Sequence, residues 1–181
     1  FLDDTACNLS SINLMKFLRE DGSFDIAGYR HTARILFLAQ EILVDLSSYP
    51  TPTIAKNSHD FRPLGLGYAN LGTLLMMMGV PYDSDRGRET AAALTAIMHL
   101  HAFGVSAEIA SVMGAFEGYE TNKEPMSKVM KMHRDAAYKI DSRLCPAELA
   151  QAAREDGDLA VELGKKHGFR NAQATVLAPT G

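Results

Sequence analysis

The stretch RPLGLGYA, residues 62–69, is the most informative part of this chain, because large and small residues alternate along it. A period of two is typical of a β-strand, and proline is tolerated at the first position of a strand. As a helix interior, the two glycines would cost about 1 kcal/mol each relative to alanine. One face of the predicted strand carries only Gly65, Gly67 and Ala69. That face would let another backbone or a ligand come close.

Extended and helical patterns alternate on both sides of this strand. An extended segment is predicted over residues 5–14 and a strand over residues 173–178. Helices are predicted over residues 25–47, 70–79, 83–113, 125–140 and 146–167. Strands separated by helices favour parallel pairing with right-handed crossovers. The sequence therefore predicts an α/β fold with about three strands and five helices.

Several helix ends carry residues with known end preferences. Asp25 is expected to cap the first helix with its carboxylate, and Pro50 and Pro52 are expected to end it. Asn70 is expected to cap the short helix after the glycine-rich strand. Pro125 suits the first turn of a later helix.

Composition excludes several classes of protein. The 181 residues are 46% apolar and 22% charged, which suits one ordinary globular domain with a sizeable core. The net charge of −4 argues against a dedicated nucleic-acid binder. No stretch approaches eighteen uncharged apolar residues, so no membrane span is predicted. Two cysteines make no disulfide framework, and a reducing, cytoplasmic setting is favoured.

The predicted strands are too few for a complete catalytic fold. Three strands neither close a barrel nor fill an open sheet, and neither end of the chain resembles a polar, loosely ordered terminus. We therefore expect residues 1–181 to be one part of a larger catalytic domain, truncated at both ends.

Cys7 has two interpretations. Most free cysteines are small buried hydrophobes, but Asp3, Asp4 and Asn8 make the surroundings of Cys7 polar, as a redox thiol requires. For Cys145, which precedes Pro146 at a predicted helix start, the packing role is favoured. A disulfide between the two cysteines is not favoured by any pattern.

The tripeptide Pro179, Thr180 and Gly181 is a candidate anion-binding loop. It combines a hydroxyl donor with a glycine amide directly after a predicted strand, where open α/β folds place phosphate sites. The same tripeptide is also a common turn, so alone it is a weak signal.

The six histidines do not indicate a metal site. His99 and His101 lie two residues apart on a predicted helix and so point to different faces. His101 falls on the apolar stripe and is predicted to be a hydrogen-bonded core residue. No Cys-x-x-Cys or Glu-x-x-His motif occurs, so no metal is predicted. The basic run from Lys123 to Arg134 is most simply a solvated helix face.

Four segments form a set that spans the chain: DDTACNLSSINL (3–14), RPLGLGYANLG (62–72), PYDSD (81–85) and RNAQATVLAPTG (170–181). Together and in this order they resemble class II ribonucleotide reductase, the adenosylcobalamin-dependent kind. The Tyr-Ala-Asn at residues 68–70 favours class II over the class I large subunit, which has the same barrel.

The resemblance implies a ten-stranded α/β barrel, of which residues 1–181 are a partial, mostly helical fragment. It implies conversion of ribonucleotides to 2′-deoxyribonucleotides by a thiyl-radical mechanism, with a cysteine pair as reductant. Adenosylcobalamin is then the cofactor of the parent enzyme, and a thioredoxin-like protein or a dithiol is its reductant. Cys7 matches one member of the reducing pair, and Pro179, Thr180 and Gly181 match the start of the loop that holds the substrate phosphates.

The resemblance also assigns chemistry to residues outside this sequence. An Asn-x-Cys-x-Glu motif with the radical cysteine is expected just upstream of Phe1, and the partner thiol of Cys7 is expected far upstream. One local departure is the run at residues 156–158, Asp-Gly-Asp, where the family's helix would have an aromatic residue. Glycine and aspartate are weak helix formers, so the helix over 146–167 is in doubt there.

Two alternatives to this interpretation are a fragment of a class I large subunit and a non-catalytic helical interaction domain. We expect the isolated chain to be inactive, because it has one of three required thiols and half of a phosphate loop. Unpaired strand edges and exposed apolar helix faces predict self-association.

Overall fold

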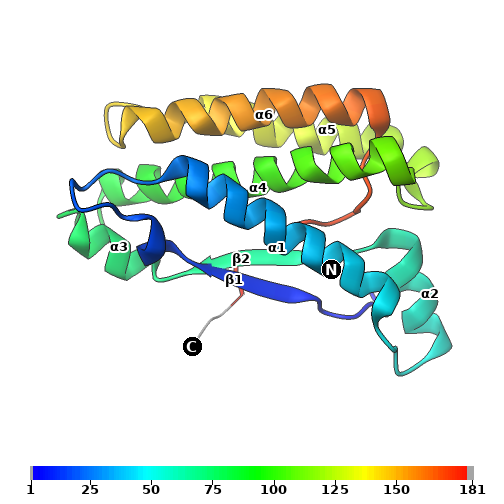
Figure 1. The fold of residues 1–181 in the computed structure, drawn as a ribbon. Helices are drawn as coiled ribbons and strands as arrows, with labels where there is room; N and C mark the ends of the chain where they lie inside the picture. Colours follow the sequence, from blue (N-terminus) through cyan, green and yellow to red (C-terminus); the bar gives the residue numbers. More distant parts are fainter. Residues whose placement is uncertain (1, 179–181) are drawn as a thin grey trace.

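The structure, a computed structural model, describes residues 2–178, which form a small parallel sheet with helices layered above one face (Figure 1). The helices α1 and α4 lie over the sheet, and α5 and α6 lie farther from it. The strands are β1 (Leu9–Asn13) and β2 (Gly65–Ala69), and a 3-10 helix, η1 (Leu14–Phe17), follows β1. The helices are α1 (Ile26–Leu46), α2 (Pro52–Phe61), α3 (Leu71–Met77), α4 (Asp85–Met113), α5 (Tyr119–Tyr138) and α6 (Ala147–His167).

The glycine-rich strand is confirmed and is the central segment of the sheet. β1 and β2 pair in parallel, from Leu9 with Gly65 to Asn13 with Ala69. On the other side of β2, Leu66 forms a parallel bridge with Thr175. The backbone N–H of Leu66 donates to the carbonyl of Ala174 at 3.0 Å.

The third predicted strand, over residues 173–178, is wrong as a strand, since pairing there is limited to the bridge at Thr175. The N–H of Val176 still donates to the carbonyl of Leu66 at 3.0 Å. The carbonyl oxygen of Val176, however, lies where a side chain on Gly67 would be. The segment therefore leaves the ladder at this residue, and the described part of the chain has two strands instead of three.

Six α-helices are described instead of five, because α2 was not predicted. The prolines after α1 do end that helix, but Pro52 also begins the next one. Thr51 caps α2 by accepting a hydrogen bond from the N–H of Ile54 at 3.2 Å. Arg62 ends α2 in the left-handed conformation, with φ of 48°.

Of the two predicted caps, one is confirmed and one differs in detail. Asp25 caps α1 as expected, accepting from the N–H of Gly28 at 3.1 Å. Asn70 occupies the cap position of α3 with φ of 71°, but its side chain makes no capping hydrogen bond. Asn70 thus contributes through its backbone, because asparagine tolerates the left-handed conformation that this turn requires.

The predicted start of α5 at Pro125 is wrong, since the helix begins at Tyr119. Tyr119 is buried against the rings of Phe116 and Phe169, with centroids 5.6 and 6.3 Å away. This packing fixes the first turn six residues before the proline, which lies inside the helix on its exposed side.

The expected weakness of α6 is also wrong, since the helix continues through residues 156–158. Asp156 is buried and accepts a hydrogen bond from Nε of Arg30 at 2.9 Å. A Cβ on Gly157 would be 3.3 Å from Leu100 and 3.1 Å from Arg134, so the glycine lets α6 approach α4 and α5 closely. Tertiary contacts here outweigh weak helix propensity.

The helix α4 forms the centre of the core. It is long and apolar enough to cross a membrane by length and composition, but 56% of its most apolar window is buried among other parts of the protein. Burial of this kind is expected of a core helix. Its fully buried residues include Leu94, Ile97 and Leu100.

Candidate functional site

Cys7 is an exposed free thiol just before β1. Its neighbours in sequence are held by hydrogen bonds: the N–H of Ala6 donates to Oγ of Ser58 at 3.2 Å. Asn8 and Gln40 form a reciprocal pair, in which each side-chain amide donates to the other's backbone carbonyl, at 2.8 and 2.7 Å. The thiol is therefore accessible while the backbone around it is anchored to α1 and α2. Within the described residues, Cys7 is therefore not packed as a small buried hydrophobe.

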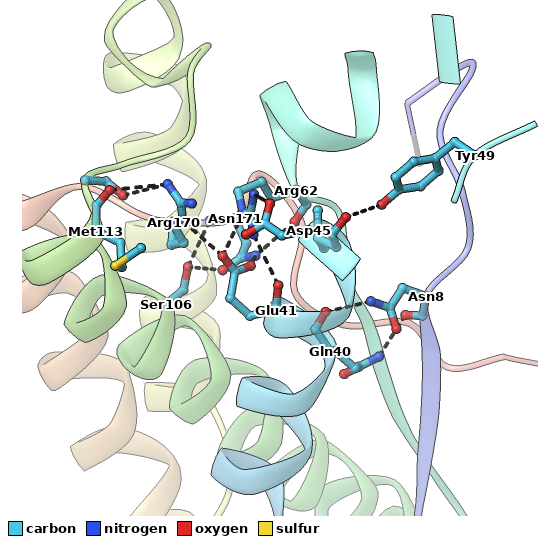
Figure 2. Close-up of polar contacts among 12 residues, drawn as sticks. Asn8, Gln40, Glu41, Asp45, Tyr49, Arg62, Ser106, Met113, Arg170 and Asn171 are labelled. Atoms are coloured by element: carbon cyan, nitrogen blue, oxygen red, sulfur yellow. Dashed lines mark hydrogen bonds and ion pairs between the residues drawn. The ribbon is translucent and has the colours of Figure 1, made fainter. Parts of the chain in front are cut away.

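The segment that leads toward residues 179–181 is fixed at its start by a buried polar cluster, which we call the Glu41 cluster (Figure 2). One carboxylate oxygen of Glu41 accepts from Nε of Arg62 at 2.6 Å and from Nε of Arg170 at 2.9 Å. The other accepts from Nδ2 of Asn171 at 2.6 Å. One carboxylate on α1 thus holds the end of α2 and the segment after α6.

Each member of the Glu41 cluster has further partners. Asp45 forms a bidentate pair with the guanidinium of Arg62, at 2.8 and 2.9 Å, which lowers the pKa of Asp45. Asn171 accepts from Oγ of Ser106 at 2.8 Å, and its side-chain amide also donates to the carbonyl of Arg62. Arg62 and Asn171 are 4% and 0% exposed, so these charges and dipoles are satisfied within the protein.

Sequence reasoning missed the Glu41 cluster. The available signal was a glutamate beside Gln40 in an otherwise apolar part of a helix, since a carboxylate buried there needs a cationic partner. The partners, Arg62 and Arg170, are 21 and 129 residues away, and their pairing with Glu41 depends on the tertiary fold.

A second arrangement that the sequence did not reveal is a chain of hydrogen bonds through His99. Nδ1 of His99 lies 2.7 Å from Oγ1 of Thr175, and Nε2 lies 2.6 Å from Nδ1 of His133. Burial, with a smaller effect of His133, lowers the pKa of His99 to about 3, and burial also lowers the pKa of His133. Both imidazoles are therefore neutral near pH 7.

The two histidines line a hollow of about 660 Å³ between α4, α5 and the end of β2. Its walls are mostly apolar, with alanines of α4 and α5 and the side chain of Leu177. Tyr68 and Thr95 contribute hydroxyls to its lining and hydrogen-bond each other at 2.8 Å.

The other predicted roles agree with the structure. Cys145 is buried, and burial together with nearby carboxylates raises the pKa of its thiol, which disfavours the reactive thiolate. Nδ1 of His101, which is only partly buried, lies 3.3 Å from the carboxylate oxygen Oδ1 of the buried Asp156, which agrees with a hydrogen-bonded role. Lys123, Lys128 and Lys131 are exposed on α5.

The predicted site residues are only partly covered by the structure. Pro179, Thr180 and Gly181 lie outside the described residues. The strand register sets Ser10 level with Leu66, and Leu66 level with Thr175. Cys7 lies before Ser10 along the chain, and Val176 lies after Thr175. The strand register therefore does not place the thiol beside the segment that leads to residues 179–181.

The described residues hold no cluster that would bind a bare metal ion, and His99 offers no free ligand to cobalt. Among residues 2–178, no group of three or more His, Cys, Asp and Glu side chains could hold a metal ion. Both ring nitrogens of His99 are already hydrogen-bonded, so this imidazole has no free lone pair for cobalt. The hollow beside it is walled mainly by alanine and leucine side chains.

Comparison with known proteins covers the whole chain. Residues 2–181 match the family described as "Ribonucleotide reductase, barrel domain". This chain belongs to that family. Over all 181 residues it is 61% identical to a "Vitamin B12-dependent ribonucleotide reductase" of Rhodopirellula baltica and spans 17% of that protein's length.

Two further relatives place the chain within the family. A protein of the same name from Bradyrhizobium diazoefficiens is 47% identical across the whole chain, which spans 16% of it. A "Ribonucleoside-diphosphate reductase large chain" of Cryptosporidium parvum is 28% identical over 96% of the chain, which covers 20% of that relative. The resemblance to class II ribonucleotide reductase is thereby confirmed.

Proposed function

We propose that the protein containing this chain is a ribonucleotide reductase, an oxidoreductase that converts ribonucleotides to 2′-deoxyribonucleotides. The observation that carries the proposal is the 61% identity, over every residue of the chain, to a relative named for that activity. Because the chain spans about a sixth of its relatives' length, the activity is proposed for the parent protein. The parent would form the complete ten-stranded barrel and act in the cytoplasm.

Cys7 is proposed as one of two thiols that reduce the ribose. The pair gives up two electrons and two protons and becomes a disulfide, while the 2′-hydroxyl leaves as water and hydrogen replaces it. The exposure of Cys7 supports this role, because an external thioredoxin-like protein or dithiol must reach the disulfide to reduce it again. The thiyl radical is assigned to a cysteine elsewhere in the parent, since Cys145 is buried.

Pro179, Thr180 and Gly181 are proposed to bind the substrate phosphates through backbone amides and the threonine hydroxyl. Support comes from the way in which the preceding residues are held. Arg170 and Asn171 are fixed in the Glu41 cluster, and Ala174 and Val176 are hydrogen-bonded to Leu66 of β2.

Adenosylcobalamin is proposed as cofactor of the parent because the relatives are named vitamin B12-dependent. Its binding residues are proposed to lie mainly in the rest of the parent, because His99 offers no free ligand to cobalt. No step of the Cys7 chemistry proposed here passes through residues of this chain that would touch the cofactor.

Variants of the full-length parent test this proposal. Cys7→Ser should abolish multiple turnover of a ribonucleotide with a dithiol reductant, whereas Cys145→Ser should retain it, because Cys145 is buried away from solvent. Product deoxyribonucleotide is measured by chromatography. Full turnover by Cys7→Ser would overturn the assignment of the reducing thiol.

The class I alternative makes a different prediction. A class I large subunit needs a radical-generating partner protein, whereas a class II enzyme needs added adenosylcobalamin. The lower identity to the Cryptosporidium large chain favours class II. Activity of the purified parent with adenosylcobalamin and without a second protein would decide between them.

A further inference from the structure

Thr175 is the residue through which the segment after α6 contacts the helix layer by a side-chain hydrogen bond to His99. Its backbone forms the bridge to Leu66 on β2. One residue later, the carbonyl of Val176 passes over Gly67 and the segment leaves the ladder. Thr175 is thus held by the sheet through its backbone and by a helix through its side chain, a few residues before residues 179–181.

The imidazole that holds Thr175 is itself fixed on three sides. Its second nitrogen is hydrogen-bonded to His133 on α5. The ring of Phe103 lies edge-on to it, with centroids 5.0 Å apart and planes at 70°. The ring of His133 also lies nearly perpendicular, at 69° and 4.5 Å. An imidazole held in this way cannot rotate without breaking both hydrogen bonds.

The proton arrangement agrees with a fixed, neutral pair. One hydrogen lies between Nε2 of His99 and Nδ1 of His133, whichever ring donates it, and two hydrogens there would break the bond. Arg88 is a charged residue in the lining of the adjoining hollow, and its guanidinium is paired with Asp83 and Asp85. No carboxylate lines this hollow to stabilise an imidazolium.

We propose that His99 and His133 are positioning residues for substrate binding: their hydrogen-bonded chain fixes Thr175 and, through it, the path by which the segment enters the phosphate loop. This inference rests on the proposed role of residues 179–181. Neither histidine touches the substrate. Their removal should therefore weaken binding of the phosphate groups and leave the chemistry of the reducing thiols unchanged.

The test compares variants of the full-length reductase. Thr175→Val removes the hydroxyl with little change of shape, and Thr175→Ser keeps it. His99→Phe removes both hydrogen bonds, whereas His99→Asn keeps a group near Nδ1. We expect Thr175→Val and His99→Phe to raise KM for the ribonucleotide by about fivefold to tenfold, the effect of one hydrogen bond, at nearly unchanged kcat.

Two further measurements separate positioning from general damage. The inhibition constant of the corresponding ribonucleoside, which has no phosphate, should be unchanged in every variant, and Thr175→Ser should restore the wild-type KM. His31→Asn, at an exposed histidine of α1, is the control.

Three results would overturn the inference while the wild-type enzyme remains active. They are an unchanged KM in Thr175→Val, a loss of kcat alone, or an equal loss of affinity for the nucleoside. If His99→Phe fails to fold, the Thr175 pair of variants decides the question. A wild-type parent that reduces no ribonucleotide would instead overturn the proposed function, and this inference with it.

Discussion

The backbone of Gly67 lies against the carbonyl oxygen of Val176, so closely that a Cβ at position 67 would overlap that oxygen. The obstacle is backbone, which cannot move aside by a rotamer change. On its other side, Gly67 is paired with Ser11 of β1. The glycine-rich face predicted from the sequence therefore serves a close approach of the chain to itself.

Gly67→Ala should destabilise the chain by about 1–3 kcal/mol, the usual cost of forcing extra volume into a packed site. Urea unfolding followed by circular dichroism measures this. Gly104→Ala is the matched control, because a Cβ on this glycine of α4 meets nothing within 4 Å. That change should stabilise the helix by up to about 1 kcal/mol. Equal effects of the two variants would contradict the close approach.

Glu41→Gln should destabilise the chain by about 1–3 kcal/mol, since the buried Arg62 and the half-buried Arg170 lose their shared carboxylate while Arg62 keeps its pair with Asp45. Glu108→Gln removes a carboxylate that pairs with Arg34 at the surface, where both side chains are about 40% exposed. A surface pair contributes about 0–1 kcal/mol, so the free energy of unfolding of this control should be almost that of the unsubstituted chain.

The two thiols should react at different rates. Cys7 is exposed and should be alkylated by iodoacetamide within minutes, whereas Cys145 is buried and should react only as the chain unfolds. Mass spectrometry of digested samples, with and without urea, measures each site. Early modification of Cys145 in the folded chain would contradict its burial.

Mild acid should weaken the fold through His99. Its pKa is about 3 when folded, against an ordinary value of 6.5, so the unfolded chain binds more protons between these values. The contribution of neutral His99 to the free energy of unfolding is therefore fully present above pH 6.5 and decreases as the pH falls below that value. Urea midpoints at pH 7, 6 and 5 should decrease, and His99→Gln should flatten the decrease. His31→Gln, at an exposed histidine, should leave the decrease of the urea midpoint with pH unchanged.

The outer face of α1 should promote self-association. Ile42 and Leu46 are 58% and 75% exposed there, next to the exposed Leu43. Light scattering of the purified chain should show a mass that increases with concentration, and Ile42→Lys with Leu46→Lys should reduce the increase. A monomer at millimolar concentration would contradict this expectation.

Local patterns allowed much of the fold to be predicted. The period of two around Gly65 and Gly67 identified β2, Asp25 marked the start of α1, and the predicted end of a helix at residue 113 is the end of α4. The missed helix α2 begins at Pro52, which also follows the end of α1. Proline is common both after a helix end and in the first turn of a helix, so local rules did not separate the two roles. The start of α5 depended on the burial of Tyr119, which no local pattern reveals.

The candidate site was less predictable than the fold. The polar neighbours of Cys7 suggested a redox thiol, but the Glu41 cluster joins residues from four separate parts of the chain. His99 and His133 are on different helices, and the sequence gives no sign that their rings meet. Contacts of this kind depend on tertiary packing.

The parallel sheet also affects the order in which this chain can fold during synthesis. β1, β2 and Thr175 are contributed by the beginning, middle and end of the sequence. While the ribosome is still making α6, β2 can pair only along one edge, and its other edge is free. A nascent chain has an open strand edge until the residues around Thr175 emerge, and binding by a chaperone would be most useful before that point.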